Sequence, residues 1–169
     1  PPPPPDASSA ASDVYKRQIV GFPGGFGTMD EVFESLVLIQ TGKSPIVPVV
    51  LVEGQDGDFW QRWEAFTKGG LLKEGWISPE DPGLYRIVSS PEEAVEEITS
   101  FYRVYQSARY VHDKLELRLT RTLTDQELAM LNDEFSILIE SGRIENTAAL
   151  PEEEEVTHLP RLVFHHTKH

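Results

Sequence analysis

The stretch that decides the fold is PGGFGTMDE, residues 23–31. A short apolar run from Ile19 to Phe22 precedes it, and an apolar-periodic segment from Met29 to Gln40 follows it. Glycines let a backbone approach a ligand closely, and the free N–H groups at a helix start attract anions. The order of strand, glycine-rich turn and helix therefore predicts an anion-binding turn, with the carboxylate of Glu31 one turn into the helix.

The periodicity of the flanking sequence extends this unit into an α/β fold. The expected strands are 19–22, 46–52 and 85–88, and the expected helices are 28–40, 58–68 and 91 to about 105. Alternating strands and helices are typical of a parallel sheet covered by helices. We therefore expect residues 19–107 to form the C-terminal part of a Rossmann-like domain with a parallel sheet.

The sequence after that domain has a different pattern, and residues 110–169 are expected to form a small α+β extension of β-α-β-β order. Thr124 and Glu127 have the spacing of a capping box at a helix start, and Gly142 is expected to end that helix. The strand at 115–119 alternates apolar and charged residues, which is typical of a half-buried strand. The expected elements are strands at 115–119, 143–147 and 161–165, and a helix at 124–140, with an acidic solvated loop at 152–155.

The amino end of the chain has the composition of a disordered segment. Residues 1–18 begin with five prolines and continue with small polar residues, which cannot build a core element. We interpret this segment as foreign to the native protein; a natural disordered tail is the alternative. An α/β domain of this kind normally has strands and helices before its glycine-rich turn, so the chain is expected to be truncated here.

Composition restricts the class of protein and its partners. The net charge is −13 and the pI is about 4.7, which argues against a nucleic-acid surface, because such a surface needs clustered Lys and Arg. Cysteine is absent, which excludes disulfides and a thiol nucleophile. The longest apolar run, 46–52, contains Pro48 and is too short for a membrane span. These features predict a cytoplasmic protein without a membrane or nucleic-acid partner.

The glycine-rich stretch also carries a family resemblance. The pattern PGG-x-GT-x-x-E resembles the signature of the Lonely Guy (LOG) family of cytokinin nucleoside-monophosphate phosphoribohydrolases, whose relatives have been labelled "possible lysine decarboxylase". The six fixed positions of that signature are all present here: Pro23, Gly24, Gly25, Gly27, Thr28 and Glu31.

The resemblance implies hydrolysis of the N-glycosidic bond of a nucleoside 5′-monophosphate, either a cytokinin ribotide or AMP. The products are the free base and ribose 5-phosphate, and no cofactor is required. It also implies a homodimer or larger assembly, for which the apolar face at Leu36–Ile39 is suited. A non-enzymatic nucleotide-binding or molybdenum-cofactor-binding protein of the same fold is the alternative.

The resemblance assigns Glu31 as the catalytic residue. The expected contacts to the phosphate and ribose are Gly24, Gly25, Phe26, Gly27 and Thr28. The alternative for Glu31 is structural, because Thr28-x-x-Glu31 also has the spacing of a capping box. Residues 22–40 contain no Lys or Arg to balance a phosphate, and the family places its arginine upstream of the motif. The chain is therefore expected to be inactive or weakly active by itself.

Two other groups of residues have structural explanations that we prefer. His165, His166 and His169 cluster near the carboxyl end without carboxylate partners in the sequence, so we expect exposed histidines and no metal site. Trp60 and Trp63 have a spacing that favours core packing over stacking on a base.

Overall fold

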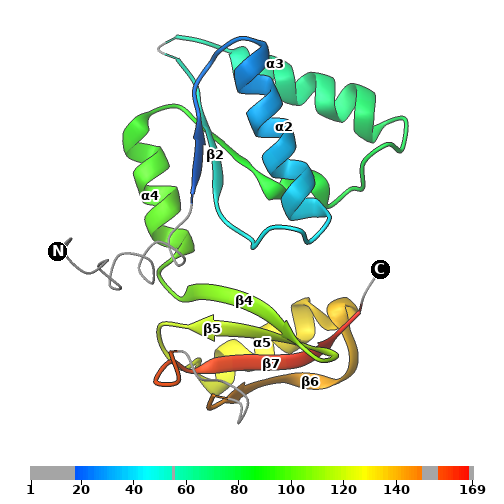
Figure 1. The fold of residues 1–169 in the computed structure, drawn as a ribbon, viewed down its shortest axis with the longest axis vertical. Helices are drawn as coiled ribbons and strands as arrows, with labels where there is room; N and C mark the ends of the chain where they lie inside the picture. Colours follow the sequence, from blue (N-terminus) through cyan, green and yellow to red (C-terminus); the bar gives the residue numbers. More distant parts are fainter. Residues whose placement is uncertain (1–17, 55, 150–155, 168–169) are drawn as a thin grey trace, which may run out of the picture. The chain divides into compact units, whose positions relative to one another are not determined.

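The structure is a computed structural model that describes residues 18–54, 56–149 and 156–167. The chain divides into two compact units, of which the first ends at Phe101 and the second begins at Tyr102 (Figure 1). The expectations for the proline-rich start and for the acidic loop at 152–155 lie outside the described residues. Within the described ranges, no helix is both long enough and apolar enough to cross a bilayer.

The first unit is a parallel sheet covered by helices, which confirms the expected α/β class. Its strands run in the order β1-β2-β3, and Gly21 lies opposite Leu51. A π-helical turn follows the second helix, and a 3-10 turn precedes the last strand. The elements are β1 (Ile19–Gly21), α2 (Phe26–Gln40), β2 (Val49–Val52), α3 (Phe59–Phe66), η1 (Thr67–Leu72), η2 (Asp81–Leu84), β3 (Arg86–Val88) and α4 (Pro91–Phe101).

The two faces of β2 pack against different helices. Val49 and Leu51 belong to the core under α2 and α3, where the Trp60 side chain is fully buried. Val50 and Val52 pack against α4 on the opposite face. Figure 1 shows α2 and α3 on one side of the sheet and α4 on the other. Burial on both faces is the pattern of a central strand in a parallel sheet, as the apolar run predicted.

Two boundaries in this unit differ from the expected ones. The second strand begins at Val49 instead of residue 46, because Pro48 has no N–H to donate to a ladder. The Pro48 carbonyl still accepts a hydrogen bond from the Ile19 amide at 3.0 Å. Helix α4 ends at Phe101 instead of about Tyr105, because Tyr105 begins a strand of the second unit.

The second unit has the order β-β-α-β-β, with one strand more than expected. The additional strand, β4, lacks the alternation that marks a half-buried strand, and it is formed by antiparallel pairing with β5. The sheet order is β4-β5-β7-β6, and every pairing is antiparallel. The elements are β4 (Tyr105–Val111), β5 (Lys114–Leu119), α5 (Asp125–Glu134), η3 (Ser136–Leu138), β6 (Ile139–Thr147) and β7 (Arg161–His166).

The helix of this unit starts where the sequence predicts and ends early. Thr124 accepts a hydrogen bond from the Glu127 amide, and the Glu127 side chain accepts one from the Thr124 amide, so the capping box is present. Hydrogen bonds from Arg121 and from the Thr124 amide lower the pKa of Glu127 to about 2. Gly142 does not end the helix; it lies inside β6 with a φ of +75°, where the register shifts against β7.

Candidate functional site

The glycine-rich turn lies where β1 ends and α2 begins, at the edge of the sheet where the parallel strands have their carboxyl ends (Figure 1). Gly25 is the N-cap of α2, and no side chain caps this helix end. The first intrahelical hydrogen bond runs from the Met29 amide to the Gly25 carbonyl at 3.2 Å. The amides of residues 26–28 therefore precede the helical ladder and point out of its positive end.

This helix start removes the capping-box alternative for Glu31. Because α2 begins at Phe26, Thr28 is the third helical residue and not the N-cap. Glu31 lies beyond the first turn and its side chain is exposed. The carboxylate is thus not engaged with the backbone of the turn, and the helix does not need it as a cap.

The three motif glycines have different surroundings. A Cβ atom on Gly24 would lie 2.2 Å from the Thr28 hydroxyl oxygen, so the Thr28 side chain folds directly over Gly24. A Cβ atom on Gly25 or Gly27 would meet nothing within 4 Å. Phe26, between them, is 97% exposed. The turn therefore presents open backbone on one side, with one hydroxyl close to it.

The open space at Gly27 permits a test of its role. Gly27→Ala meets no steric obstacle and should stabilise α2 by about 0.5 to 1 kcal/mol, because alanine favours the helix. If an anion occupies this space, the added methyl group should weaken binding of inorganic phosphate by roughly tenfold, as a lost charge-assisted hydrogen bond would.

A thermal melt and calorimetric phosphate titration measure both quantities for Gly27→Ala. Gly69→Ala is the matched control, because Gly69 is also helical and a Cβ atom there also meets nothing within 4 Å. Phosphate affinity that falls equally in both variants, or in neither, would contradict an anion site at this turn.

Sequence reasoning missed one residue at the same edge of the sheet. Glu53 follows β2 directly, is only 7% exposed, and accepts a hydrogen bond from the Gln61 amide at 2.8 Å. Its second carboxylate oxygen, Oε2, is buried without a hydrogen-bond partner among the described residues. The signal was present in the sequence, because an acidic residue immediately after a buried parallel strand lies at the ligand-binding edge of such sheets.

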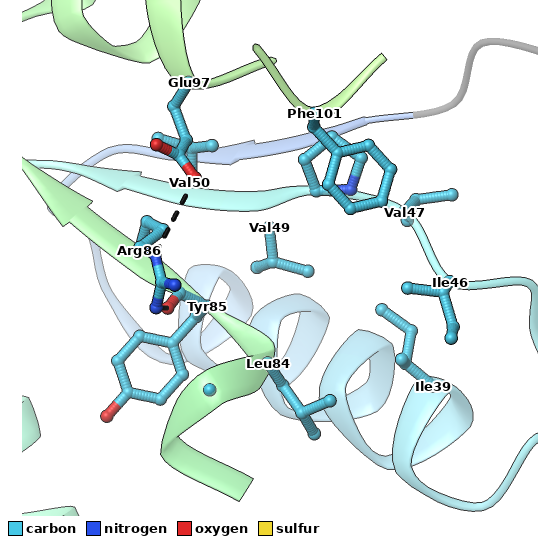
Figure 2. Close-up of a pocket in the computed structure, with 12 residues that line it drawn as sticks. Ile39, Ile46, Val47, Val49, Val50, Leu84, Tyr85, Arg86, Glu97 and Phe101 are labelled. Atoms are coloured by element: carbon cyan, nitrogen blue, oxygen red, sulfur yellow. Dashed lines mark hydrogen bonds and ion pairs between the residues drawn. The ribbon is translucent and has the colours of Figure 1, made fainter. Parts of the chain in front are cut away.

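The pocket of about 180 Å³ in Figure 2 lies at the opposite edge of the sheet. Val49 and Arg86, the first residues of β2 and β3, line it, together with Glu97, which forms an ion pair with Arg86 at 3.7 Å. Tyr85 also borders this pocket, and burial together with the Glu64 carboxylate raises its pKa to about 12. Since no motif residue reaches this pocket, it is not part of the candidate site.

Three further expectations concern a metal site, the histidines near the carboxyl end and a subunit contact. In the part of the chain that the structure describes, no three His, Asp or Glu side chains are grouped to hold a metal ion. The expectation of exposed histidines is wrong for His165 and His166, which are half-buried: His165 lies 3.1 Å from the Asp113 carboxylate, and His166 lies 2.9 Å from the Tyr110 hydroxyl. His169 is outside the described residues. On the apolar face proposed for subunit contact, Ile39 is buried and Val37 is 49% exposed. The homodimer stays a prediction.

The comparison with known families agrees with this arrangement. The model of a family described as "Possible lysine decarboxylase" matches residues 13–98, slightly more than half of the chain. The chain belongs to this family. It is the LOG family whose signature the motif resembles, and the match covers β1, α2 and the entire parallel sheet. No curated protein matches the chain significantly. The LOG-family match ends before the second unit begins.

Proposed function

We propose that the chain binds a nucleoside 5′-monophosphate at the turn before α2 and weakly hydrolyses its N-glycosidic bond, giving the free base and ribose 5-phosphate. Membership in the LOG family supports the reaction class. The observation that carries the proposal is the start of α2 at Phe26, which leaves three amides at the helix end and leaves Glu31 outside the cap.

Within the turn and α2, backbone groups and not cationic side chains would hold the phosphate. Residues 22–40 contain no Lys or Arg, and Lys43 lies beyond the opposite end of α2, where its amide bonds to the Leu38 carbonyl. The positive end of a helix is equivalent to roughly half an elementary charge. The amides of residues 26–28 and the Thr28 hydroxyl supply the hydrogen bonds that an anion needs in addition.

The Glu31 carboxylate acts on the sugar in this proposal. Water adds to the anomeric carbon as the bond to the base breaks, and the departing base takes up a proton. The transition state carries positive charge on the ribose ring. A carboxylate near that ring stabilises the charge or accepts the proton of the attacking water. Glu31 is exposed and lies one turn beyond the phosphate-binding amides, which suits either role.

Incubation with AMP and with isopentenyl-AMP tests this function. We expect both nucleotides to bind, and ribose 5-phosphate to appear together with adenine or isopentenyladenine, detected by chromatography over long incubations at high protein concentration. Binding without release of base would favour the non-enzymatic nucleotide carrier. Absence of binding by AMP and by inorganic phosphate would reject the phosphate site itself.

A further inference from the structure

Glu53 lies beside the glycine-rich turn, at the carboxyl end of the middle strand. Gly21, the last residue of β1, pairs with Leu51, so Glu53, just past the end of β2, lies near the start of the turn that follows β1. A Cβ atom on Gly54 would lie 3.9 Å from the Pro23 ring, so the segments that follow β1 and β2 run close together. The Glu53 amide continues the ladder with a 2.9 Å hydrogen bond to the Val88 carbonyl.

The Glu53 side chain lies on the face of the sheet that α2 and α3 cover. Side chains alternate along a strand, and Leu51, two residues earlier, belongs to the core under these helices. Glu53 Oε1 accepts the hydrogen bond of the Gln61 amide, which is the third residue of α3. The carboxylate is therefore held at the amino end of α3, and the amino end of α2 lies on the same face and edge of the sheet.

A structural role for Glu53 accounts for only one of its two carboxylate oxygens. One oxygen is sufficient to accept the amide at the start of α3, whereas Oε2 is buried and has no partner within residues 18–54, 56–149 and 156–167. Burial of an unsatisfied charged acceptor is costly, so such a group requires an explanation. A carboxylate accepts hydrogen bonds and repels anions, so the missing partner is a neutral or cationic donor.

We propose that Glu53 Oε2 accepts a hydrogen bond from a ribose hydroxyl of the bound nucleotide and thereby selects ribose over deoxyribose. The inference rests on the proposed function, which places the 5′-phosphate at the start of α2. β1 and β2 are neighbouring strands, which lie about 4.8 Å apart, so the carboxyl end of β2 adjoins the turn that follows β1. Oε2 is buried in the ligand-free protein, so binding requires the carboxylate to turn about its soft terminal torsion.

Nucleotides that lack one hydroxyl test this assignment in the wild-type chain. Calorimetric titrations would compare AMP with 2′-deoxy-AMP, 3′-deoxy-AMP and IMP, with inorganic phosphate as a probe of the turn alone. We expect AMP to bind about tenfold or more tighter than one of the two deoxynucleotides, which is the scale of a hydrogen bond to a charged group. IMP, which keeps both hydroxyls and lacks the amino group, should not show this loss.

Substitution then connects the selectivity to Glu53. Glu53→Gln keeps an oxygen for the Gln61 amide and replaces the second acceptor with a donor, so the preference for AMP over the deoxynucleotide should fall to about one-third of its value or less. Glu93→Gln is the matched control, because Glu93 also accepts a backbone amide at this edge of the sheet, that of Ser89 at 2.6 Å. The control should keep the wild-type preference.

The outcomes separate the inference from the function on which it rests. If phosphate and AMP bind, and both deoxynucleotides bind as tightly as AMP, the proposed role of Glu53 is wrong. The phosphate site is then still supported. If IMP also binds more weakly than AMP, by as much as the deoxynucleotides do, the preference follows the amino group of the base, and the role of Glu53 is again wrong. If neither phosphate nor AMP binds, the proposed function fails, and the inference fails with it.

Discussion

Glu31→Gln is expected to reduce release of ribose 5-phosphate by about 100-fold or more while leaving the protein as stable as the wild type. Glutamine has the same shape as glutamate and lacks the charge that stabilises a cationic sugar or accepts a proton. Stability should change by less than about 0.5 kcal/mol, because Glu31 is exposed and does not cap α2. Turnover of AMP and a urea melt of the same preparations measure the two effects.

Glu34→Gln is the control for this experiment. Glu34 lies nearly one turn further along α2 and is also exposed, so the control removes the same charge from the same helix. It should keep wild-type turnover. Inorganic phosphate should bind both variants at least as tightly as it binds the wild type, because a nearby negative charge is removed. Turnover by Glu31→Gln at the wild-type rate would refute the catalytic role of Glu31.

Glu116→Ala is expected to destabilise the second unit by about 3 to 5 kcal/mol, the scale for removing one partner of a buried ion pair. Glu116 Oε1 lies 3.2 Å from Arg109 Nε, 3.3 Å from Arg118 Nε and 3.7 Å from Arg161 Nε. Glu116 and Arg161 are fully buried. Arg118 and Arg161 are directly opposite each other on paired strands, so without the carboxylate two like charges face each other.

A loss of this size is comparable with the whole stability of a small domain. Hydrogen exchange monitored by mass spectrometry should show β5 and β7 losing protection. All tryptophans of the chain are in the first unit, so their fluorescence follows that unit separately. Glu145→Ala, at an exposed position of the same sheet, should change stability by less than about 0.5 kcal/mol. Equal protection in the two variants would contradict the structural role of Glu116.

The first unit could be predicted largely from local sequence. The apolar run before residue 23 and the periodicity after Thr28 predicted β1 and α2, because strand and helix periods differ and are visible in a single segment. The start of α2 was predicted two residues late. The TxxE spacing of a capping box is present at Thr28 and Glu31, yet the helix begins at Phe26, since a glycine can also serve as the N-cap.

The second unit shows where local pattern is insufficient. The Leu-Glu-Leu-Arg-Leu alternation of β5 predicted one buried and one solvated face, whereas Glu116 is 0% and Arg118 6% exposed. Strand β4 has no alternation, and Gly142 lies in a strand although it resembles a helix stop. In each case the deciding interaction is pairing with a segment far away in the sequence, which no local window contains.

The chain alone determined the parallel α/β class, the glycine-rich turn and the position of Glu31, because these depend on residue type and on spacing within about one turn of helix or one strand. Only the tertiary structure decided that Glu31 is free of the cap, that Gly54 lies close to Pro23, and that the preceding Glu53 has one oxygen without a partner among the described residues. These results depend on where a helix begins and on the register of two strands. Such features are set by packing between residues about 30 positions apart, which a linear pattern does not record.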